Sequence, residues 1–252
     1  MMEQKMKIKV LSIFPNMFNT LFEYGVLKKS IEKGIVDFEA INLRDYTDDK
    51  HHVTDIPGYG GKSGMVMKVE PFFKYYEEYS KDGEKPYVIM TSPQGIKFDN
   101  SVSRYLSEKK KLLFLCGRYE GIDARIEKIV DKEVSIGDFV VTGGEIPAML
   151  MIDSLLRFVP GVVGDNDSVI NDSFYNGLLD YSQYTKPYDF NGEKVPEILL
   201  SGNHLKIEKY RKKNSLLNTI LKRKDLFIKR KLSEEEKELL TEIIGELYNN
   251  AK

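Results

Sequence analysis

The chain has 252 residues, of which 41% are hydrophobic, so it can bury one large core or two modest ones. Its 38 Lys and Arg nearly balance its 39 Asp and Glu, so the net charge indicates no class of partner. The single cysteine, Cys116, excludes a disulfide framework and a Cys-based zinc site and is typical of a reducing compartment. No apolar run reaches the ~18 residues of a membrane-spanning helix, and the N-terminus lacks a signal-peptide core. We therefore expect a cytoplasmic protein that does not enter membranes.

The first 160 residues alternate between two hydrophobic periods. Apolar β-formers cluster, as in strands, at 7–14, 36–43, 87–92, 112–117 and 134–141. Helical spacing occurs at 16–33, 100–110, 121–131 and 146–158. This alternation predicts an α/β fold with a mostly parallel sheet covered by helices.

The composition changes after residue 163. Residues 164–173 are polar and acidic, which predicts an exposed linker. Residues 206–231 then hold eleven Lys or Arg against two acids, whereas 233–246 hold six Glu against Lys237. Ser233 is placed to cap a helix whose apolar face comes from leucines and isoleucines. The pattern predicts an α/β domain over 1–163, a linker over 164–173 and a small helical domain over 174–252.

Three predicted strands lead into glycine-containing loops: "TSPQG" (91–95), "CGRYEG" (116–121) and "TGGE" (142–145). Each loop alone is ordinary turn chemistry. Together, at the carboxyl ends of neighbouring parallel strands, they predict a cleft lined by backbone groups that a ligand can approach. The Gly143–Gly144 pair is interpreted as making room for that ligand.

Other motifs fail on spacing or context. "GYGGKSG" (58–64) contains Gly-Lys-Ser, but the first glycine of a P-loop would fall on Ile56. No G-x-G-x-x-G occurs. "GKSG" fits the Gly-x-x-Gly of a KH loop, but that pattern is common by chance and the surrounding alternation of strands and helices is wrong for a KH domain. His51 and His52, beside three aspartates, favour a solvated loop over a metal site because no further ligand follows at suitable spacing. Cys116 is interpreted as a buried apolar residue.

The helix predicted at 146–158 is apolar nearly all round, so it lies either in the core or against a second subunit. Arg157 at its C-terminal end suits the helix dipole, or it binds developing negative charge at a cleft. Asp172 and Ser173 fall in the linker, where a carboxylate is normally only solvated.

Several motifs together resemble a known enzyme family. They are "YGGKSGMVMK", "TSPQG", "CGRYEGID", "SIGDFVVTGGEIPAM", "RFVPGVVG", "NDSF", "GLLDYSQYTKP" and "LLSGNHLKIEKYR". In order and over nearly the whole chain, they resemble the bacterial tRNA (guanine-N1)-methyltransferases, which are SPOUT methyltransferases. The resemblance implies a deep trefoil knot in the α/β domain, a helical C-terminal domain that binds tRNA, and a homodimer whose active site is shared between subunits.

The implied reaction transfers a methyl group from S-adenosyl-L-methionine to N-1 of guanosine 37 in tRNA, which maintains the reading frame. By motif position, the resemblance implies the following cofactor-binding residues: Pro93, Gly95, Gly117, Tyr119, Gly121, Ser135, Ile136, Gly137, Asp138, Phe139, Val140, Val141, Gly143, Gly144 and Pro147. The implied substrate-binding residues are Asp55, Gly64, Ser168, Ser173 and Asp180. Mg²⁺ is associated with the family, but no metal ligand is assigned.

Guanine N-1 carries a hydrogen at neutral pH, so its methylation needs a general base and stabilisation of charge at the 6-oxo group. The resemblance implies Asp172 as the base, reaching the partner subunit's cofactor, and Arg157 as the stabiliser. It also gives the basic segment 206–231 a purpose as a surface for the tRNA backbone, whereas composition alone predicts a solvated helix face.

Two positions depart from the family pattern. Gln183 stands where many relatives have His, and Phe139 stands where relatives often have Tyr. Two other functions remain open: a SPOUT methyltransferase with a different target nucleotide, and a non-catalytic RNA-binding protein.

Overall fold

The computed structural model describes residues 5–61, 63–164 and 169–250. Two compact units divide the chain, Met1–Gly164 and Asp165–Lys252. None of the helices in these described ranges has the length and apolar character needed to cross a bilayer.

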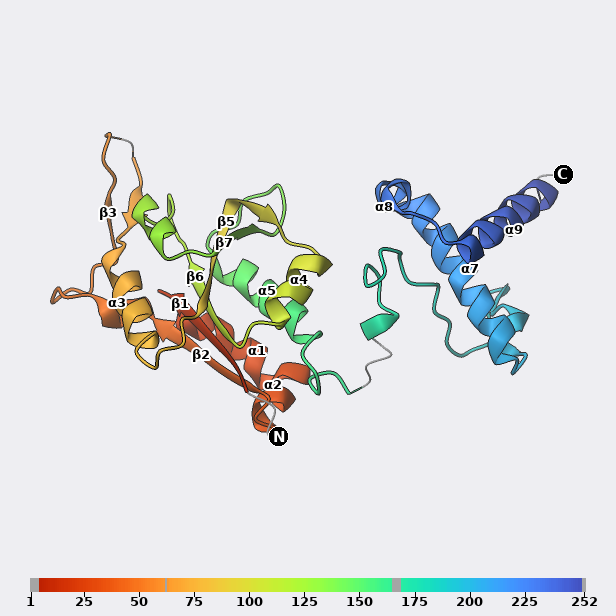
Figure 1. Cartoon of the computed structure of the whole chain (residues 1–252), viewed down its shortest axis with the longest axis horizontal. Coiled ribbons are helices and arrows are strands. Elements are labelled where there is room, and N and C mark those ends of the chain that lie inside the picture. Colours follow the sequence, from red (N-terminus) through yellow and green to blue (C-terminus); the bar gives the residue numbers. More distant parts are fainter. Residues whose placement is uncertain (1–4, 62, 165–168, 251–252) are drawn as a thin grey trace. The chain divides into compact units, whose positions relative to one another are not determined.

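A five-stranded sheet forms the centre of the first unit, in the order β2-β1-β6-β5-β7 (Figure 1). Its strands are β1 (Met6–Ser12), β2 (Val36–Asn42), β5 (Tyr87–Lys97), β6 (Lys111–Cys116) and β7 (Lys132–Ser135). Every pairing within it is parallel. The predicted α/β fold with a mostly parallel sheet is confirmed. The trefoil knot stays a prediction.

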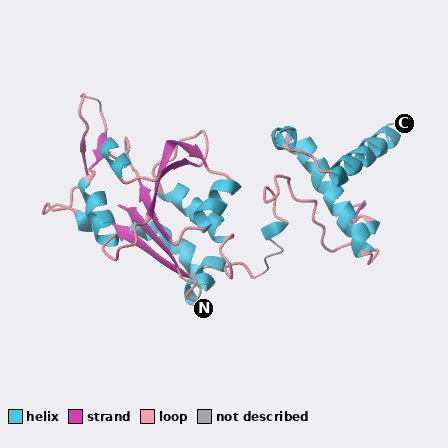
Figure 2. Ribbon diagram, in the orientation of Figure 1, coloured by secondary structure: helices cyan, strands magenta, loops and turns pink. Residues whose placement is uncertain are grey.

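The sheet is buried on both faces, as a parallel sheet with helical crossovers requires (Figure 2). All six residues of β6 are buried, and the five from Leu112 to Cys116 alternate between two hydrophobic clusters. Phe114 packs in the cluster that contains α5 (Glu145–Leu156), whereas Leu113 and Leu115 pack in the cluster that contains α3 (Glu70–Tyr79). The helix α4 (Asn100–Ser107) contacts α5 on the first of these faces.

The helix predicted over 16–33 is interrupted. The chain forms a 3₁₀ turn η1 (Pro15–Phe18), then α1 (Asn19–Glu23) and α2 (Gly25–Glu32). Tyr24 is extended between the two α-helices, and Gly25 has a φ of 73°. That left-handed backbone favours glycine, which explains why the continuous apolar spacing does not give a continuous helix.

The strand predicted over 134–141 is wrong beyond Ser135. The Ser135 hydroxyl donates to the carbonyl of Gly137 at 3.0 Å, and Gly137 has a φ of 147°, which ends the extended run. Val140 is 83% exposed, so this stretch of β-formers is a surface loop. The helix predicted over 121–131 is also wrong in extent, because only a 3₁₀ turn η3 (Ala124–Lys128) forms after the capping residue Asp123.

The segment between β2 and β5, to which the sequence analysis assigned no helix or strand, is structured. It contains a 3₁₀ turn η2 (Leu43–Tyr46), the hairpin of β3 (Asp55–Pro57) and β4 (Met65–Met67), and α3. The aromatic residues Phe72 and Tyr75 anchor α3 on the sheet.

The second unit is helical, with α7 (His204–Lys222), α8 (Lys224–Lys229) and α9 (Glu234–Asn250). A small hairpin, β8 (Asp189–Phe190) with β9 (Glu193–Lys194), and a 3₁₀ turn η4 (Glu197–Leu200) precede them. Its core cluster consists of Leu178, Leu216, Leu239 and Ile243. The predicted cap is confirmed: Ser233 Oγ accepts from the Glu236 amide at 3.2 Å, and Glu236 Oε2 accepts from the Ser233 amide at 2.8 Å.

Candidate functional site

A cavity of about 300 Å³ lies at the carboxyl edge of the sheet in the first unit. Its walls come from the middle of β5, the loop after β6, the 3₁₀ turn η3, and the loop from β7 into α5. The predicted cofactor residues that line it are Pro93, Gly117, Tyr119, Gly121, Ser135, Ile136, Phe139, Val140, Val141, Gly143, Gly144 and Pro147. The structure thus brings together the three glycine-containing segments that the sequence predicted to line a common cleft.

Gly95, Gly137 and Asp138 belong to the predicted set but do not line this cavity. The "TSPQG" stretch is not a loop at a strand end, because β5 continues to Lys97 through a register shift between Thr91 and Ile96. A Cβ on Gly95 would lie 2.3 Å from the backbone nitrogen of Val134. Gly95 therefore permits the close approach of β5 to β7.

The Gly143–Gly144 pair also packs against the protein itself. A Cβ on Gly144 would lie 2.1 Å from Thr91 Oγ1 and 2.8 Å from Cys116 Cα. A Cβ on Gly143 would lie 2.2 Å from Arg118 Nε. The Gly144 amide donates to the Gly117 carbonyl at 2.8 Å, which ties the start of α5 to the loop after β6. The sequence analysis interpreted this pair as making room for a ligand. The structure corrects that interpretation, because both glycines also permit close packing within the protein.

A buried ionic network lies beneath the loop after β6. The Glu145 side chain is fully buried, and its Oε2 accepts from Arg118 Nε at 3.0 Å while its Oε1 accepts from the Ser12 hydroxyl at 2.6 Å. The Arg118 guanidinium also lies 4.6 Å from the ring centroid of Phe14. Because Arg118 lines the cavity, this network fixes a cation in its wall.

The sequence interpretation missed Arg118 and Glu145. One signal was available: Glu145 is an acid in the first turn of an otherwise apolar helix, where the dipole favours negative charge. The partner of that acid could not be read from the sequence, since Arg118 belongs to another loop.

The hairpin of β3 and β4 reaches the same loop. The Glu120 amide donates to the Met65 carbonyl at 3.1 Å, and Gly64 has a φ of 125°. A Cβ on Gly64 would lie 2.7 Å from the side chain of Glu120, a residue of the cavity wall. Asp55 begins β3, and its Oδ1 accepts from the Thr54 hydroxyl at 3.2 Å. Gly64 is thus adjacent to the cavity wall through Glu120.

Arg157 caps the C-terminal end of α5 and is exposed. It does not line the cavity. Its amide donates to the Ser154 carbonyl at 3.3 Å, so the backbone there continues the helical turn.

Asp172 belongs to the second unit, in a segment that is folded rather than fully exposed. Val169 is only 8% exposed, Asp172 is half-buried, and the Tyr175 amide donates to the Asp172 carbonyl at 3.2 Å. Ile170 and Asn171 beside them are exposed, so the end of the predicted linker is partly buried and partly exposed. Residues 165–168, including the predicted substrate residue Ser168, lie outside the described residues.

Ser173 and Asp180, both predicted to bind substrate, lie in direct contact. The Asp180 amide donates to Ser173 Oγ at 2.8 Å. Gln183 Nε2 donates to Asp180 Oδ2 at 3.2 Å, so the glutamine contacts this carboxylate directly.

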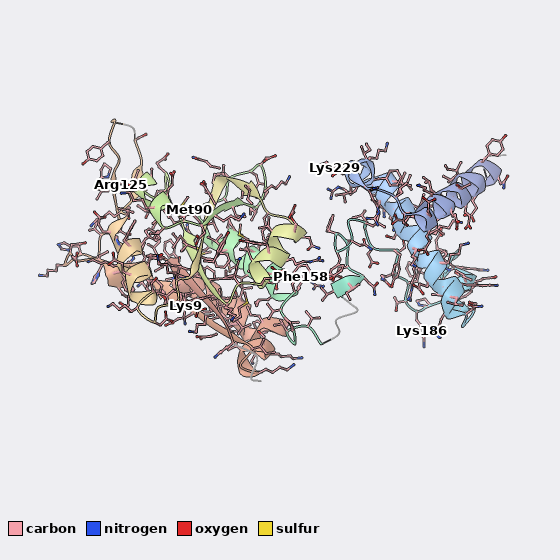
Figure 3. The ribbon with its side chains drawn as sticks, viewed as in Figure 1. Lys9, Met90, Arg125, Phe158, Lys186 and Lys229 are labelled. Carbon is pink, nitrogen blue, oxygen red and sulfur yellow. The ribbon has the colours of Figure 1, made fainter. Side chains whose placement is uncertain are left out.

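The basic segment 206–231 is divided between two environments. Lys209, Lys212 and Lys213 on α7 form ion pairs with Glu242, Glu235 and Glu246 of α9, which crosses α7 (Figure 1). Arg230 pairs with Glu236. Within the described part of the chain, no ion pair involves Lys222, Lys224 or Lys229. Figure 3 shows Lys229 on α8, at the end of the second unit opposite Lys186.

The remaining candidates have structural explanations. Burial, followed by the nearby Glu145 charge, raises the pKa of the Cys116 thiol, so this cysteine is an inert core residue. His52 Nδ1 lies 2.9 Å from the Arg44 carbonyl, and Asp49 accepts from the amides of His51 and Val53. Those contacts fold the loop locally. The described residues contain no group of three or more His, Cys, Asp or Glu that could hold a metal ion.

Known proteins resemble this chain over nearly its full length. A tRNA (guanine-N(1)-)-methyltransferase of Thermosipho africanus is 52% identical over 247 residues, covering 98% of this chain and all of that protein. One from Carboxydothermus hydrogenoformans is 52% identical over 243 residues, covering 96% of this chain and 95% of the relative.

The fold resembles a solved structure as well. The crystal structure of tRNA (m1G37) methyltransferase from Aquifex aeolicus superposes with a TM-score of 0.73 at 39% identity, covering 89% of this chain and 96% of that chain. Residues 6–229 match the family described as tRNA (Guanine-1)-methyltransferase TrmD. The chain therefore belongs to the tRNA (guanine-1)-methyltransferase TrmD family.

Proposed function

We propose that this protein transfers a methyl group from S-adenosyl-L-methionine to N-1 of guanosine 37 in tRNA. The observation that carries the proposal is the strand-edge cavity built by the motifs that the chain shares with its family. The chain is accordingly an S-adenosylmethionine-dependent tRNA (guanine-N1)-methyltransferase. We propose that it acts in the cytoplasm, where its tRNA substrate is found.

The cavity residues fit the methyl donor. A volume of about 300 Å³ lies at the lower end of the range for small-molecule sites, which is ~300–1,000 Å³. The glycines Gly117 and Gly121 leave backbone groups accessible in its wall, and Phe139 and Val140 supply apolar surface. When bound, S-adenosylmethionine supplies an electrophilic methyl group on its sulfonium.

The protein supplies the proton transfer and the charge stabilisation. In this proposal the Asp172 carboxylate removes the N-1 proton of guanine, and the Arg157 guanidinium stabilises negative charge on its 6-oxo oxygen. Ser173 and Asp180 contact the guanine, and Gly64 with Asp55 belongs to a loop that approaches it. Gly95 and Gly137 support the cavity without lining it, because they pack against the lining residues Val134 and Phe139.

A homodimer is part of the proposal. The face of the first unit around α5 exposes Val140 (83%), Phe139 (57%), Ile146 (46%) and Leu150 (46%). Ile146 and Leu150 are four residues apart, so they lie on one side of α5. Such an apolar surface supports association with a second copy of the chain. We propose that the trefoil knot and a contribution of Asp172 to the partner's site accompany this dimer.

Methylation of unmodified tRNA transcripts tests the proposed function. We expect methyl incorporation with guanosine at position 37, retention with inosine, which keeps the N-1 hydrogen and the 6-oxo group, and loss with adenosine. Incorporation at another position would instead support a SPOUT methyltransferase with a different target. Intact tRNA affinity without S-adenosylmethionine binding in calorimetry would support a non-catalytic RNA-binding protein. Mg²⁺ dependence, measured in the same assay after chelation, stays a prediction.

A further inference from the structure

One face of α7 carries four polar residues that are turned toward irregular chain rather than toward solvent. Asn214, Ser215, Asn218 and Thr219 are spaced so that they lie side by side on the helix, and we call them the polar ladder. Thr219 is fully buried, and the other three are half-buried. Polar side chains on a core-facing helix surface require hydrogen-bond partners, because a buried donor or acceptor without one is costly.

The partners of the polar ladder are backbone groups of residues 179–182. Thr219 Oγ1 accepts from the Leu179 amide at 2.9 Å, and Asn214 Oδ1 accepts from the Ser182 amide at 2.6 Å. Asn218 Nδ2 donates to the Asp180 carbonyl at 3.1 Å, and the Ser215 hydroxyl donates to the Leu179 carbonyl. Residues 179–182 themselves form neither helix nor strand. The polar ladder therefore takes the place of regular secondary structure in fixing it.

Thr219 has the most constrained role in the polar ladder. Its hydroxyl donates to the Ser215 carbonyl one turn earlier at 2.8 Å. That bond orients the oxygen lone pair toward the Leu179 amide. A threonine that bonds back to its own helix in this way normally contributes little to stability. Here it provides the acceptor for a segment next to Asp180.

The residues held by the polar ladder belong to the proposed substrate site. Asp180 is fixed on both sides, through its carbonyl by Asn218 and through its amide by Ser173 Oγ. Its carboxylate accepts from the Tyr181 amide at 2.7 Å and from Gln183. Ser173 directly follows Asp172 in the chain. The geometry of this segment is thus set by residues 214–219 of α7, which lie outside the quoted family motifs.

We infer that the polar ladder of α7, and Thr219 above all, positions Asp180 and Ser173 for the methyl-accepting nucleotide. The inference rests on the proposed function, and it assigns these four residues as positioning residues rather than catalytic ones. Their effect acts through the backbone of residues 179–182, so they influence the rate without contacting the RNA.

The decisive variants are Thr219→Val, which keeps the shape and removes the hydroxyl, and Thr219→Ser, which keeps the hydroxyl. Single-turnover methyl transfer is measured with saturating full-length enzyme. Its rate constant reports positioning, since partial unfolding lowers the active fraction and not the rate constant at saturation. We expect Thr219→Val to lower the rate constant about 10- to 100-fold, and Thr219→Ser to restore it to within about threefold. S-adenosylmethionine affinity should not change.

Thr241→Val on α9 is the matched control, because the Thr241 hydroxyl donates to the Lys237 carbonyl of its own helix at 2.9 Å and to no other described residue. Asn218→Asp is a second test that keeps the side-chain shape and replaces the donor to the Asp180 carbonyl with an acceptor. Wild-type rate constants in both Thr219→Val and Asn218→Asp would overturn the inference, as would a Thr219→Ser variant no faster than Thr219→Val. If the wild-type enzyme itself does not methylate guanosine 37, the proposed function fails instead.

Discussion

The two units hold their functional residues in different ways. In the first, the cavity depends on backbone segments in close contact, with Gly95 and Gly144 placed where a Cβ would collide with neighbouring main chain. In the second, the segment from Ser173 to Ser182 is irregular and is held by side-chain hydrogen bonds from α7. The comparison teaches that adding atoms should damage the first site, whereas removing polar atoms should damage the second.

The largest effect is expected for Gly144→Val. The new side chain would overlap Thr91 and the backbone of residues 116–117, so we expect a loss of more than ~3 kcal/mol in the free energy of unfolding and no cofactor binding. Denaturant unfolding measures the first quantity. Gly245→Ala in α9 is the control, because its Cβ would meet no described atom within 4 Å apart from its chain neighbours and its own helix backbone, and it should be stabilising by ~0.5–1 kcal/mol. A Gly144→Val variant as stable as the wild type would refute the packing explanation.

Asp172→Asn should act on chemistry alone. Removal of the proposed base is expected to slow single-turnover methyl transfer by ~10²–10⁴-fold. Calorimetry should show unchanged S-adenosylmethionine binding, because Asp172 is not among the residues that line the cavity. Asp189→Asn, at the start of β8, should leave the rate unchanged. Near-normal transfer by Asp172→Asn would remove this residue from the mechanism.

Glu145→Gln tests the buried network of the first unit. The substitution keeps the side-chain shape but leaves Arg118 without its counter-ion, so we expect a loss of about 1–3 kcal/mol in stability and weaker cofactor binding. Arg125→Gln breaks an exposed pair with Asp123 and should cost less than ~1 kcal/mol. Equal losses in the two variants would contradict a special role for the buried pair.

Neutralising lysines should separate the two environments of the basic segment. A Lys222→Gln, Lys224→Gln and Lys229→Gln triple variant is expected to weaken tRNA binding about tenfold and to reduce its salt dependence. The matched triple variant, Lys209→Gln, Lys212→Gln and Lys213→Gln, removes charges that α9 already pairs and should affect affinity less. Filter binding at several salt concentrations measures both. The opposite ranking would place the RNA on the α9 side of α7.

The smallest effect is expected in the stability of the protein at acidic pH. Hydrogen bonds from the Arg125 side chain and backbone lower the pKa of Asp123 to about 2. Its ionised form therefore contributes stability above the unfolded value of ~3.9, and this contribution disappears as the pH falls toward 2. Because the pair is largely exposed, we expect less than ~1 kcal/mol. Asp123→Asn should flatten the pH dependence of unfolding between pH 4 and pH 2, and an unchanged slope would contradict the assignment.

Hydrophobic periodicity was sufficient to predict the parallel sheet, α5 and the capped helix α9. It failed at Gly25, where a left-handed backbone conformation interrupts a helix. It also failed in β5 beyond Thr91, where pairing with β7 extends the strand. The helix α3 was missed because its apolar residues are aromatics mixed with glutamates and a lysine, which read as a polar stretch.

The candidate site was predictable in part. Motif resemblance located most of the cavity wall, because those segments are contiguous in the chain. The Arg118–Glu145–Ser12 network and the contact of Thr219 with Leu179 join residues that are 27 to 133 positions apart. Such pairings depend on the folded arrangement, and no local pattern in a single sequence specifies them.

The ion pairs between α7 and α9 have a consequence for selectivity. A nucleic acid that binds a lysine surface gains free energy by releasing the small ions condensed on its phosphates. On the α9 side of α7, the lysines are already paired with glutamate carboxylates of α9. An RNA would have to break these ion pairs before its phosphates could contact the lysines. The exchange yields little entropy, so this face discriminates against arbitrary polyanions and leaves productive binding to RNAs that also fit the rest of the site.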